Sequence, residues 1–422
     1  MIKLLDENSF LELVMSRRAR GFAEADKVRA IVADVAARGD KALFEYTKKF
    51  DNIDISADNI AVSQKEIEEC IAAVEPKLMA ALIRAKDNII ELNKAQLRKD
   101  SIIGAKGRRV GYVVRPVERA GIYAPGGKSP YPSSVLMCAL PAVVAGVEEI
   151  IMCTPAGSGL NPLTIAAAHL CGIKRMYKVG GAQAVAAMAY GTESISKADV
   201  ITGPGNIYVA LAKREVFGVA GIDMIAGPSE ILVIADSTAD PCVIAADLLS
   251  QAEHDEMAMS ALITDNAKLA KDVQTEVEKQ LINLTKADIA RKSIDTNGAV
   301  VVVDNLKQAA LLSNEVAPEH LELCTADPHA LLPYIKSAGA VFMGHYSPEP
   351  LGDYFAGPNH VLPTEGSARF FSSLGVDNYI KKISIIEYDK KTLQVVKDDV
   401  IALAEAEGFG AHAEAVKMRF TK

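Results

Sequence analysis

Residues 131–156 read YPSSVLMCALPAVVAGVEEIIMCTPA, an apolar helical run that leads directly into a short apolar strand. The same pairing recurs on both sides of this stretch. Strands are expected over residues 109–117, 148–156, 175–181 and 198–205, and helices over residues 131–147, 162–173, 182–191 and 206–218. Strands that alternate with helices are typical of a parallel sheet covered on both faces. The stretch therefore predicts an α/β fold.

A second series of alternating elements begins near residue 229. We expect three more strands and three more helices, at 229–236, 259–265 and 298–305, and at 240–255, 266–281 and 305–317. The chain is therefore predicted to hold two Rossmann-like parallel-sheet α/β domains of similar build. Amphipathic helices are expected over residues 1–100, and a helical C-terminal tail over 389–419. Residues 344–375 are irregular and rich in Gly, Pro and aromatics, which favours a functional segment.

Composition excludes several classes of function. The 422 residues carry a formal net charge of −8 without a basic stripe between aromatics, so nucleic acid is not expected as a partner. No uncharged apolar run reaches the roughly 18 residues of a membrane span, and no secretory signal is present, so a cytoplasmic protein is expected. The six cysteines form no C-x-x-C pair, and we expect them to be reduced and buried.

Three glycine-rich turns follow expected strands of the first series: APGG at 124–127, VGGAQ at 179–183 and TGPGN at 202–206. Such turns expose backbone N–H groups and suit phosphate binding, although a tight turn without a ligand has the same composition. The stretch GIYAPGGKSP (121–130) misses the P-loop spacing by one position, and Gly203-x-Gly205 does not complete a dinucleotide fingerprint. Together the three turns favour a ligand crevice along the carboxyl edge of the sheet.

Four of the seven histidines lie in dense polar settings: QAEHDE, APEHLEL, GPNHVLP and GFGAHAEA. In the first, Gln251 and His254 are three residues apart and share one face of a helix, although a solvated helix end would read the same way. Zinc draws on His and carboxylate ligands. The candidate ligands are Gln251, His254, Asp353, His360 and His412, and their spacing does not choose among them.

Glu319 and His320 are adjacent where an expected helix gives way to the strand LELC. A neighbouring Glu and His can divide general-base work, with His acting on a substrate hydroxyl and Glu on a water molecule. A surface turn is the alternative. The apolar surroundings of Cys138 and Cys153 favour inert thiols over a nucleophile for aldehyde oxidation.

Eight segments in order over nearly the whole chain resemble the histidinol dehydrogenase family: GIYAPGGKSPYPSSVLM, VGGAQAVAAMAYGT, TGPGNIYV, IAGPSEILVIAD, DLLSQAEHD, NEVAPEHLEL, GDYFAGPNHVLPTEGSARF and EGFGAHAEA. The resemblance implies a zinc- and NAD-dependent enzyme that completes histidine biosynthesis. It implies a four-electron oxidation of L-histidinol to L-histidine by two NAD⁺ through a bound aldehyde. A paralogous zinc- and NAD-dependent dehydrogenase of another small alcohol, such as a sulfonated diol, is an alternative, and a non-catalytic metal-binding scaffold is another.

The resemblance also implies roles for individual residues. Glu319 and His320 would be catalytic, with Glu319 activating water and His320 taking the hydroxyl proton. The implied zinc ligands are Gln251, His254, Asp353 and His412. The implied substrate contacts are these four with Ser229, Glu319, His320, His360 and Glu407. The implied NAD contacts are Tyr123, Gln183 and Asn206.

The resemblance further implies three parts of the chain and a homodimer. Residues 1–122 and 230–365 would form a discontinuous α/β domain with the N-terminal helices, the zinc ion and the catalytic residues. Residues 123–229 would form a Rossmann-like NAD-binding domain. Residues 366–422 would form a tail for dimerisation that brings Glu407 and His412 to the partner's site. One zinc ion per subunit is expected.

Overall fold

The computed structural model describes residues 1–18, 24–126 and 131–421. Within it the chain divides into two compact units, the first made of Met1–Gln96 and Val117–Tyr379 and the second of Leu97–Pro116 and Ile380–Lys422. Residues 127–130, which end the glycine-rich stretch GIYAPGGKSP, lie outside the described residues.

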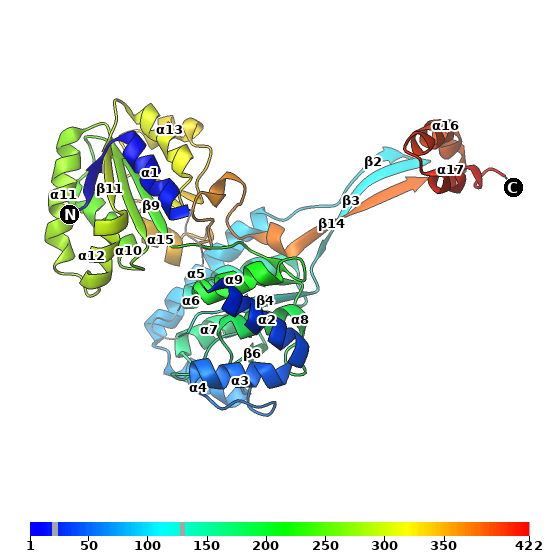
Figure 1. Ribbon diagram of the computed structural model, residues 1–422, viewed down its shortest axis with the longest axis horizontal. Helices are drawn as coiled ribbons and strands as arrows, with labels where there is room; N and C mark the ends of the chain where they lie inside the picture. The colour runs from blue at the N-terminus through cyan, green and yellow to red at the C-terminus, as the bar shows by residue number, and fades with distance from the viewer. Residues whose placement is uncertain (19–23, 127–130, 422) are drawn as a thin grey trace. The chain divides into compact units, whose positions relative to one another are not determined.

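The first unit contains two sheets that are parallel throughout, as the alternating pattern predicts (Figure 1). The smaller sheet has the strand order β6-β5-β4-β7-β8, with β4 (Arg119–Tyr123), β5 (Glu149–Cys153), β6 (Arg175–Tyr177), β7 (Val200–Thr202) and β8 (Gly221–Ile222). The chain adds β5 and β6 on one side of β4 and then returns to add β7 on the other side. Open α/β sheets bind ligands at such a reversal, outside the carboxyl ends of the strands.

Eight helices among the described residues cover the two faces of the smaller sheet. One face packs against α4 (Gln64–Ala73), α5 (Pro76–Ala95), α6 (Pro132–Ala145) and α7 (Pro162–Leu170). The other packs against α2 (Ala25–Arg38), α3 (Asp40–Asp51), α8 (Gly181–Tyr190) and α9 (Ile207–Val216). Successive strand side chains alternate between the two cores, as Ile151 and Met152 do, because side chains of a strand point to opposite faces in turn.

The larger sheet has the order β1-β11-β10-β9-β12-β13, with β1 (Lys3–Leu5), β9 (Glu230–Ala235), β10 (Met259–Thr264), β11 (Ala299–Val302), β12 (His320–Cys324) and β13 (Ala340–Met343). Its strand order reverses at β9, between β10 and β12. One face packs against α10 (Pro241–Ala252), α11 (Ala267–Leu281) and α12 (Ala287–Asn297). The other packs against α1 (Glu7–Arg18), α13 (Leu306–Val316) and α14 (Pro328–Leu331).

The second unit corrects one of the predicted strands. Residues 109–117 were expected in a parallel sheet, but β3 (Arg108–Pro116) pairs antiparallel with β2 (Ser101–Ala105) and β14 (Ile380–Tyr388). The strand β3 is only half-buried, whereas a parallel strand is buried on both faces. Lys106 and Gly107 form the two-residue turn to β2, and Gly107 has the positive φ that such turns favour. The unit ends in α16 (Lys390–Ala406) and α17 (Gly410–Lys417), the predicted helical tail.

Residues 344–375 hold little regular structure, as predicted: the helix α15 (Glu349–Tyr354) and the 3₁₀ turn η2 (Ser367–Arg369). Two further 3₁₀ turns are η1 (Leu332–Tyr334) and η3 (Val376–Tyr379). None of the helices in the described ranges has the length and apolar character needed to cross a lipid bilayer.

A buried ion pair fixes the turn after β7. The Lys213 ammonium donates to the Asp223 carboxylate at 2.6 Å and to the Gly203 carbonyl at 2.9 Å. The same carboxylate accepts the backbone N–H groups of Gly203 at 2.8 Å and Met224 at 2.7 Å. Gly203 has a φ of +123°, and a Cβ there would lie 2.1 Å from the Tyr123 carbonyl oxygen. The turn TGPGN is therefore held tightly against the end of β4.

Replacement of Lys213 by Met should destabilise the fold strongly, because it leaves the Asp223 carboxylate buried without its cation. Breaking a buried pair costs about 3–5 kcal/mol. The free energy of unfolding in urea measures the effect. Lys268→Met, which removes the exposed partner of Asp272, should cost less than about 1 kcal/mol and serves as the control. A similarly small loss for Lys213→Met would contradict a structural role for the pair.

Candidate functional site

The adjacent residues Glu319 and His320 lie at the amino edge of the larger sheet, where β12 begins beside β9. The His320 ring is 4 % exposed, and its Nδ1 lies 2.9 Å from the backbone carbonyl oxygen of Glu230. Because a carbonyl oxygen only accepts, Nδ1 donates the hydrogen and Nε2 keeps its lone pair. Burial lowers the pKa of His320 to about 4, against the opposing effect of Asp353. His320 is therefore a neutral base at neutral pH.

The Glu319 carboxyl group is also bound by the backbone of Glu230, the first residue of β9. Its Oε2 accepts the backbone N–H of Glu230 at 2.9 Å, and the Ser229 hydroxyl also donates to it. It lies 3.7 Å from Nδ1 of His320. Burial raises the pKa of Glu319 well above its usual value. A nearby positive charge would be needed for this group to ionise readily.

Helix α15 brings two further acids to His320. Oε1 of Glu349 lies 3.8 Å from Nε2 of His320 and has no hydrogen-bond partner among the described residues. Burial, followed by the neighbouring Asp353, raises the pKa of Glu349 to about 9. One ligand atom from each of His320, Glu349 and Asp353 lies within 4.8 Å of the other two. The sequence interpretation missed Glu349, although its spacing of four residues from Asp353 within 344–375 was the available signal.

His360 joins this cluster to the smaller sheet. Its Nδ1 lies 2.9 Å from the Asp353 carbonyl oxygen and 3.7 Å from the Asp353 carboxylate. Its Nε2 lies 3.1 Å from the hydroxyl of Ser134, near the start of α6. The ring is thus oriented from both sides.

A cavity of about 270 Å³ opens beside these residues. His320, Asp353 and His360 supply its titratable walls, and Phe342 and Leu351 are among its apolar ones. Such a mixture suits a small molecule with polar groups at one end.

The predicted ligands Gln251 and His254 lie at the end of α10. The Gln251 side chain is fully buried, and neither atom of its amide has a hydrogen-bond partner among the described residues. A buried amide without hydrogen bonds costs free energy of folding. The Gln251 amide is therefore suited to bind a ligand through its carbonyl oxygen. His254 is exposed, and its partial enclosure lowers the pKa of the ring while nearby Asp353 opposes that shift.

The predicted cofactor residues lie at the carboxyl edge of the smaller sheet. Tyr123 ends β4, and its hydroxyl accepts the backbone N–H of Gly181 at 3.1 Å. Gln183 in the first turn of α8 is 1 % exposed, and both of its amide atoms lack a partner within the described ranges. Asn206 caps α9 through the N–H groups of Tyr208 and Val209.

One residue at this edge was not predicted. Asp51, at the end of α3, accepts the backbone N–H of Gly180, and its Oδ2 is buried without a partner in the described structure. Burial raises the pKa of this carboxyl group. The sequence offered no signal for Asp51, because it lies in a helical segment far from the glycine-rich turns.

Comparison with known proteins identifies the family. The family model for histidinol dehydrogenase matches residues 16–420. A histidinol dehydrogenase of Bacillus thuringiensis subsp. konkukian (strain 97-27) is 52% identical over 422 residues, which cover 99% of this chain and 96% of that protein. The chain belongs to the histidinol dehydrogenase family.

Two other relatives agree. A histidinol dehydrogenase of Syntrophotalea carbinolica is 52% identical over 427 residues, with 99% of each chain covered. The crystal structure of histidinol dehydrogenase from Elizabethkingia anophelis superposes with a TM-score of 0.90 at 41% identity, covering 95% of this chain and 93% of that one. Membership of the histidinol dehydrogenase family makes the chain an oxidoreductase and implies NAD and a metal ion as cofactors.

The two remaining predicted site residues belong to the second unit. Glu407 follows α16, and His412 lies in α17 with its ring 5.2 Å from that of Phe409. Both are exposed. Their histidinol dehydrogenase roles, like those of the other residues above, remain predictions.

Cys242 is exposed, against the expectation that all six cysteines are buried, whereas the buried thiols Cys138 and Cys153 agree with the expectation that they are inert. Cys138 and Cys153 are inaccessible to solvent, and burial raises the pKa of each thiol above its usual range. A thiol that keeps its proton is a poor nucleophile.

Burial of His320 should make the metal-free protein sensitive to acid. The pKa of His320 is about 4 when folded and about 6.5 when unfolded, so the unfolded chain binds more protons between these values. Stability therefore rises with pH across this window. Relative to His320→Asn, the wild type should lose up to about 1.4 kcal/mol per pH unit as pH falls below about 6.5.

Urea unfolding of both proteins at several pH values measures this difference. Ser293→Ala removes a buried hydrogen bond to the Ala258 carbonyl and no titratable group, so its curve should run parallel to that of the wild type. Parallel curves for the wild type and His320→Asn would show that His320 is not held neutral by burial.

Proposed function

We propose that the chain oxidises L-histidinol to L-histidine with two NAD⁺ and one zinc ion per subunit. The observation that carries this proposal is the convergence of His320, Glu349 and Asp353 to within 4.8 Å beside a cavity. These residues come from separate segments, and their chemistry combines a neutral base with acids that can attract a cation. Family membership supplies the substrate and the cofactor.

The donor set fits zinc. The unpaired buried amide of Gln251 offers an oxygen, Asp353 offers a carboxylate, and His254 and His412 offer imidazole nitrogens. These four residues would hold the ion. Zinc would supply a fixed positive charge and orient the imidazole and amino groups of the substrate.

His320 would act as the general base of both oxidations. Its Nε2 accepts the hydroxyl proton of the bound alcohol while hydride leaves the same carbon for NAD⁺. The Nδ1–H bond to the Glu230 carbonyl fixes the ring and disperses the charge that this proton brings. Oε1 of Glu349 lies 3.8 Å from Nε2, and Glu349 would stabilise the imidazolium that forms only in its ionised state, which a bound cation would favour.

Glu319 would act between the two oxidations. Once it is ionised, it would take a proton from water as the oxygen adds to the bound aldehyde, while the protonated His320 returns its proton to the aldehyde oxygen, which yields the hydrate and leaves His320 neutral again. His320 then accepts a proton from the hydrate as the second hydride leaves. Each oxidation thus releases one hydride and one proton, and retention of the aldehyde within the cavity protects it from side reactions.

Further contacts follow from the same arrangement. Ser229 would bind the substrate beside Glu319, to which its hydroxyl donates. His360, oriented by Ser134 and Asp353, would form another wall of the substrate site. Glu407 would contact the substrate from the tail.

Tyr123, Gln183 and Asn206 would bind NAD at the carboxyl edge of the smaller sheet. The division of the chain into a zinc domain (1–122 and 230–365), an NAD domain (123–229) and a tail (366–422) belongs to this proposal, as does a cytoplasmic location.

The decisive experiment follows NADH absorbance with limiting L-histidinol. We expect two NADH for each histidinol, loss of turnover after treatment with a chelator, and recovery on addition of zinc. A sulfonated diol serves as the competing substrate, and activity on that diol without activity on histidinol would favour the paralogous dehydrogenase. Zinc binding without turnover of either alcohol would instead favour a non-catalytic metal-binding scaffold, and a His320→Ala variant with unchanged turnover would remove His320 as the base.

We also propose a homodimer in which the tail of one subunit completes the site of its partner with Glu407 and His412. A mixing experiment tests the exchange. His320→Ala and His412→Ala should each be nearly inactive alone. Refolded together, they should regain activity, because each mixed dimer then has one site with an intact body and an intact tail. Mixtures without activity would place each tail in its own subunit's site.

A further inference from the structure

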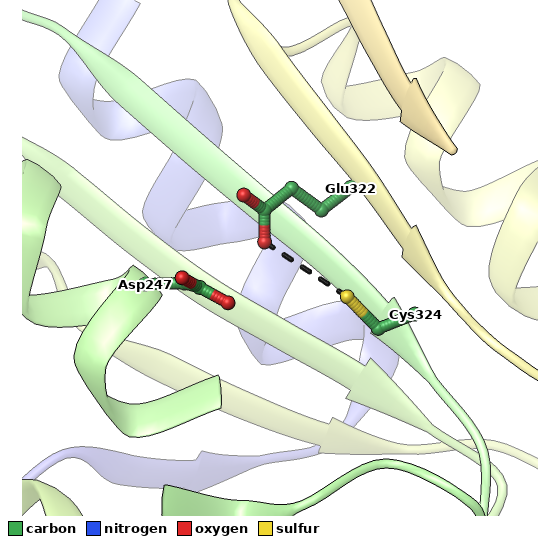
Figure 2. Close-up of side chains that lie close together, drawn as sticks. All are labelled: Asp247, Glu322 and Cys324. Carbon is green, nitrogen blue, oxygen red and sulfur yellow. Dashed lines mark hydrogen bonds between the residues drawn. The ribbon is translucent and has the colours of Figure 1, made fainter. Parts of the chain in front are cut away.

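Three buried side chains meet further along β12 from His320. They are Asp247 of α10, and Glu322 and Cys324 of β12. One ligand atom from each lies within 4.8 Å of the other two. Figure 2 shows the carboxyl groups of Asp247 and Glu322 facing each other, with the Cys324 sulfur beside Glu322. None of the three was singled out from the sequence.

Hydrogen bonds join these three side chains: Sγ of Cys324 lies 4.0 Å from Oε2 of Glu322, and Glu322 bonds to Asp247. Burial raises the pKa of the Cys324 thiol above its usual range and that of Glu322 well above its usual value, so both keep their protons. Burial also raises the pKa of Asp247 to about 6. The group at neutral pH is therefore one ionised carboxylate, one neutral acid and one thiol, which hydrogen bonds can satisfy.

The hydrogen bonds of Glu322 connect two helices. Its protonated carboxyl group donates to Asp247 of α10, and its Oε1 accepts the backbone N–H of Glu349 at 2.8 Å. Glu349 is the first residue of α15, so Glu322 satisfies one of the free N–H groups at the start of that helix. A single side chain, 1 % exposed, thus bonds to α10 and α15 at once.

Each residue in this set of hydrogen bonds lies one helical turn, or two strand residues, from a proposed site residue. Asp247 precedes Gln251 by four residues in α10, and Glu349 precedes Asp353 by four residues in α15. Glu322 follows His320 by two residues in β12. Residues four apart in a helix and two apart in a strand share a face. Glu322 thus joins α10, α15 and β12 next to the side chains that form the proposed site.

We propose that Glu322 is a positioning residue that sets the separation of α10 and α15, and with it the distance between Gln251 and Asp353. The inference rests on the proposed function, because these two residues are proposed zinc ligands. Groups that support metal ligands without touching the metal change affinity about 10–100-fold when removed. Glutamine at position 322 can still accept the Glu349 N–H and bond to Asp247, whereas leucine can form neither of these two bonds.

The test measures zinc affinity by competition with a chromophoric chelator, on the full-length protein. Glu322→Leu should bind zinc at least about ten-fold more weakly than the wild type, and Glu322→Gln should stay within about three-fold. Asp247→Ala, which removes only the α10 partner, should also weaken binding and serves if Glu322→Leu does not fold. The absorption spectrum of the cobalt-substituted protein should change in Glu322→Leu and not in Glu322→Gln.

Ser260→Ala is the matched control. It breaks a buried hydrogen bond between β10 and the Leu248 carbonyl of α10 without touching α15. It should lower the melting temperature and leave zinc affinity unchanged. If Glu322→Leu behaves in the same way, or if Glu322→Gln loses as much affinity as Glu322→Leu, the inference is wrong while the proposed function stands. A wild type that binds no zinc would overturn both.

Discussion

The peptide unit of Glu230 is the constraint on which the site depends. Its carbonyl oxygen accepts from Nδ1 of His320, and its N–H donates to the Glu319 carboxyl group. Both bonds exist because β12 pairs with β9 in a register that sets His320 opposite Ile231. A slip of one residue would turn His320 to the other face of the sheet. The orientation of the proposed base is therefore a property of the sheet and needs no flexible loop.

The proposed site residues of the first unit lie at opposite edges of their two sheets. Tyr123 ends its strand, whereas His320 begins its strand. A helix that follows a strand runs back along it, so α10 returns Gln251 to the amino edge of the larger sheet. Two contacts join the edges: Ser134 of α6 with His360, and the Met137 carbonyl of α6 with the Asn359 amide at 2.6 Å. The segment that walls the cavity is thus anchored on the sheet proposed to bind the hydride acceptor.

The hydrophobic periodicity of the sequence was sufficient to predict most of the fold. It could not predict pairings or residue roles that depend on contacts formed only in the folded chain. The alternating runs predicted both parallel sheets, because strands buried on both faces read as short apolar runs. The pairing of β3 with β14 escaped, since the two strands lie more than 260 residues apart in sequence. The same limit hid Glu349, Asp51 and Glu322, whose significance depends on neighbours that only folding supplies. Gln251 was a candidate from its spacing with His254, but nothing in the sequence showed that its amide is buried and unpaired.

Buried acids dominate the electrostatics of the larger sheet's amino edge. Glu230, Glu319, Glu322 and Glu349 all have a raised pKa because burial disfavours their charged forms. The Arg17 guanidinium lies 3.6 Å from Glu230, and the pKa of Glu230 is still raised to about 7. A divalent cation held at Asp353 would reverse this balance for the groups closest to it, since positive charge favours ionised carboxylates. Metal binding and proton release are then one linked event, so Glu319 would gain the ionised form that water activation requires only in the metal-bound protein.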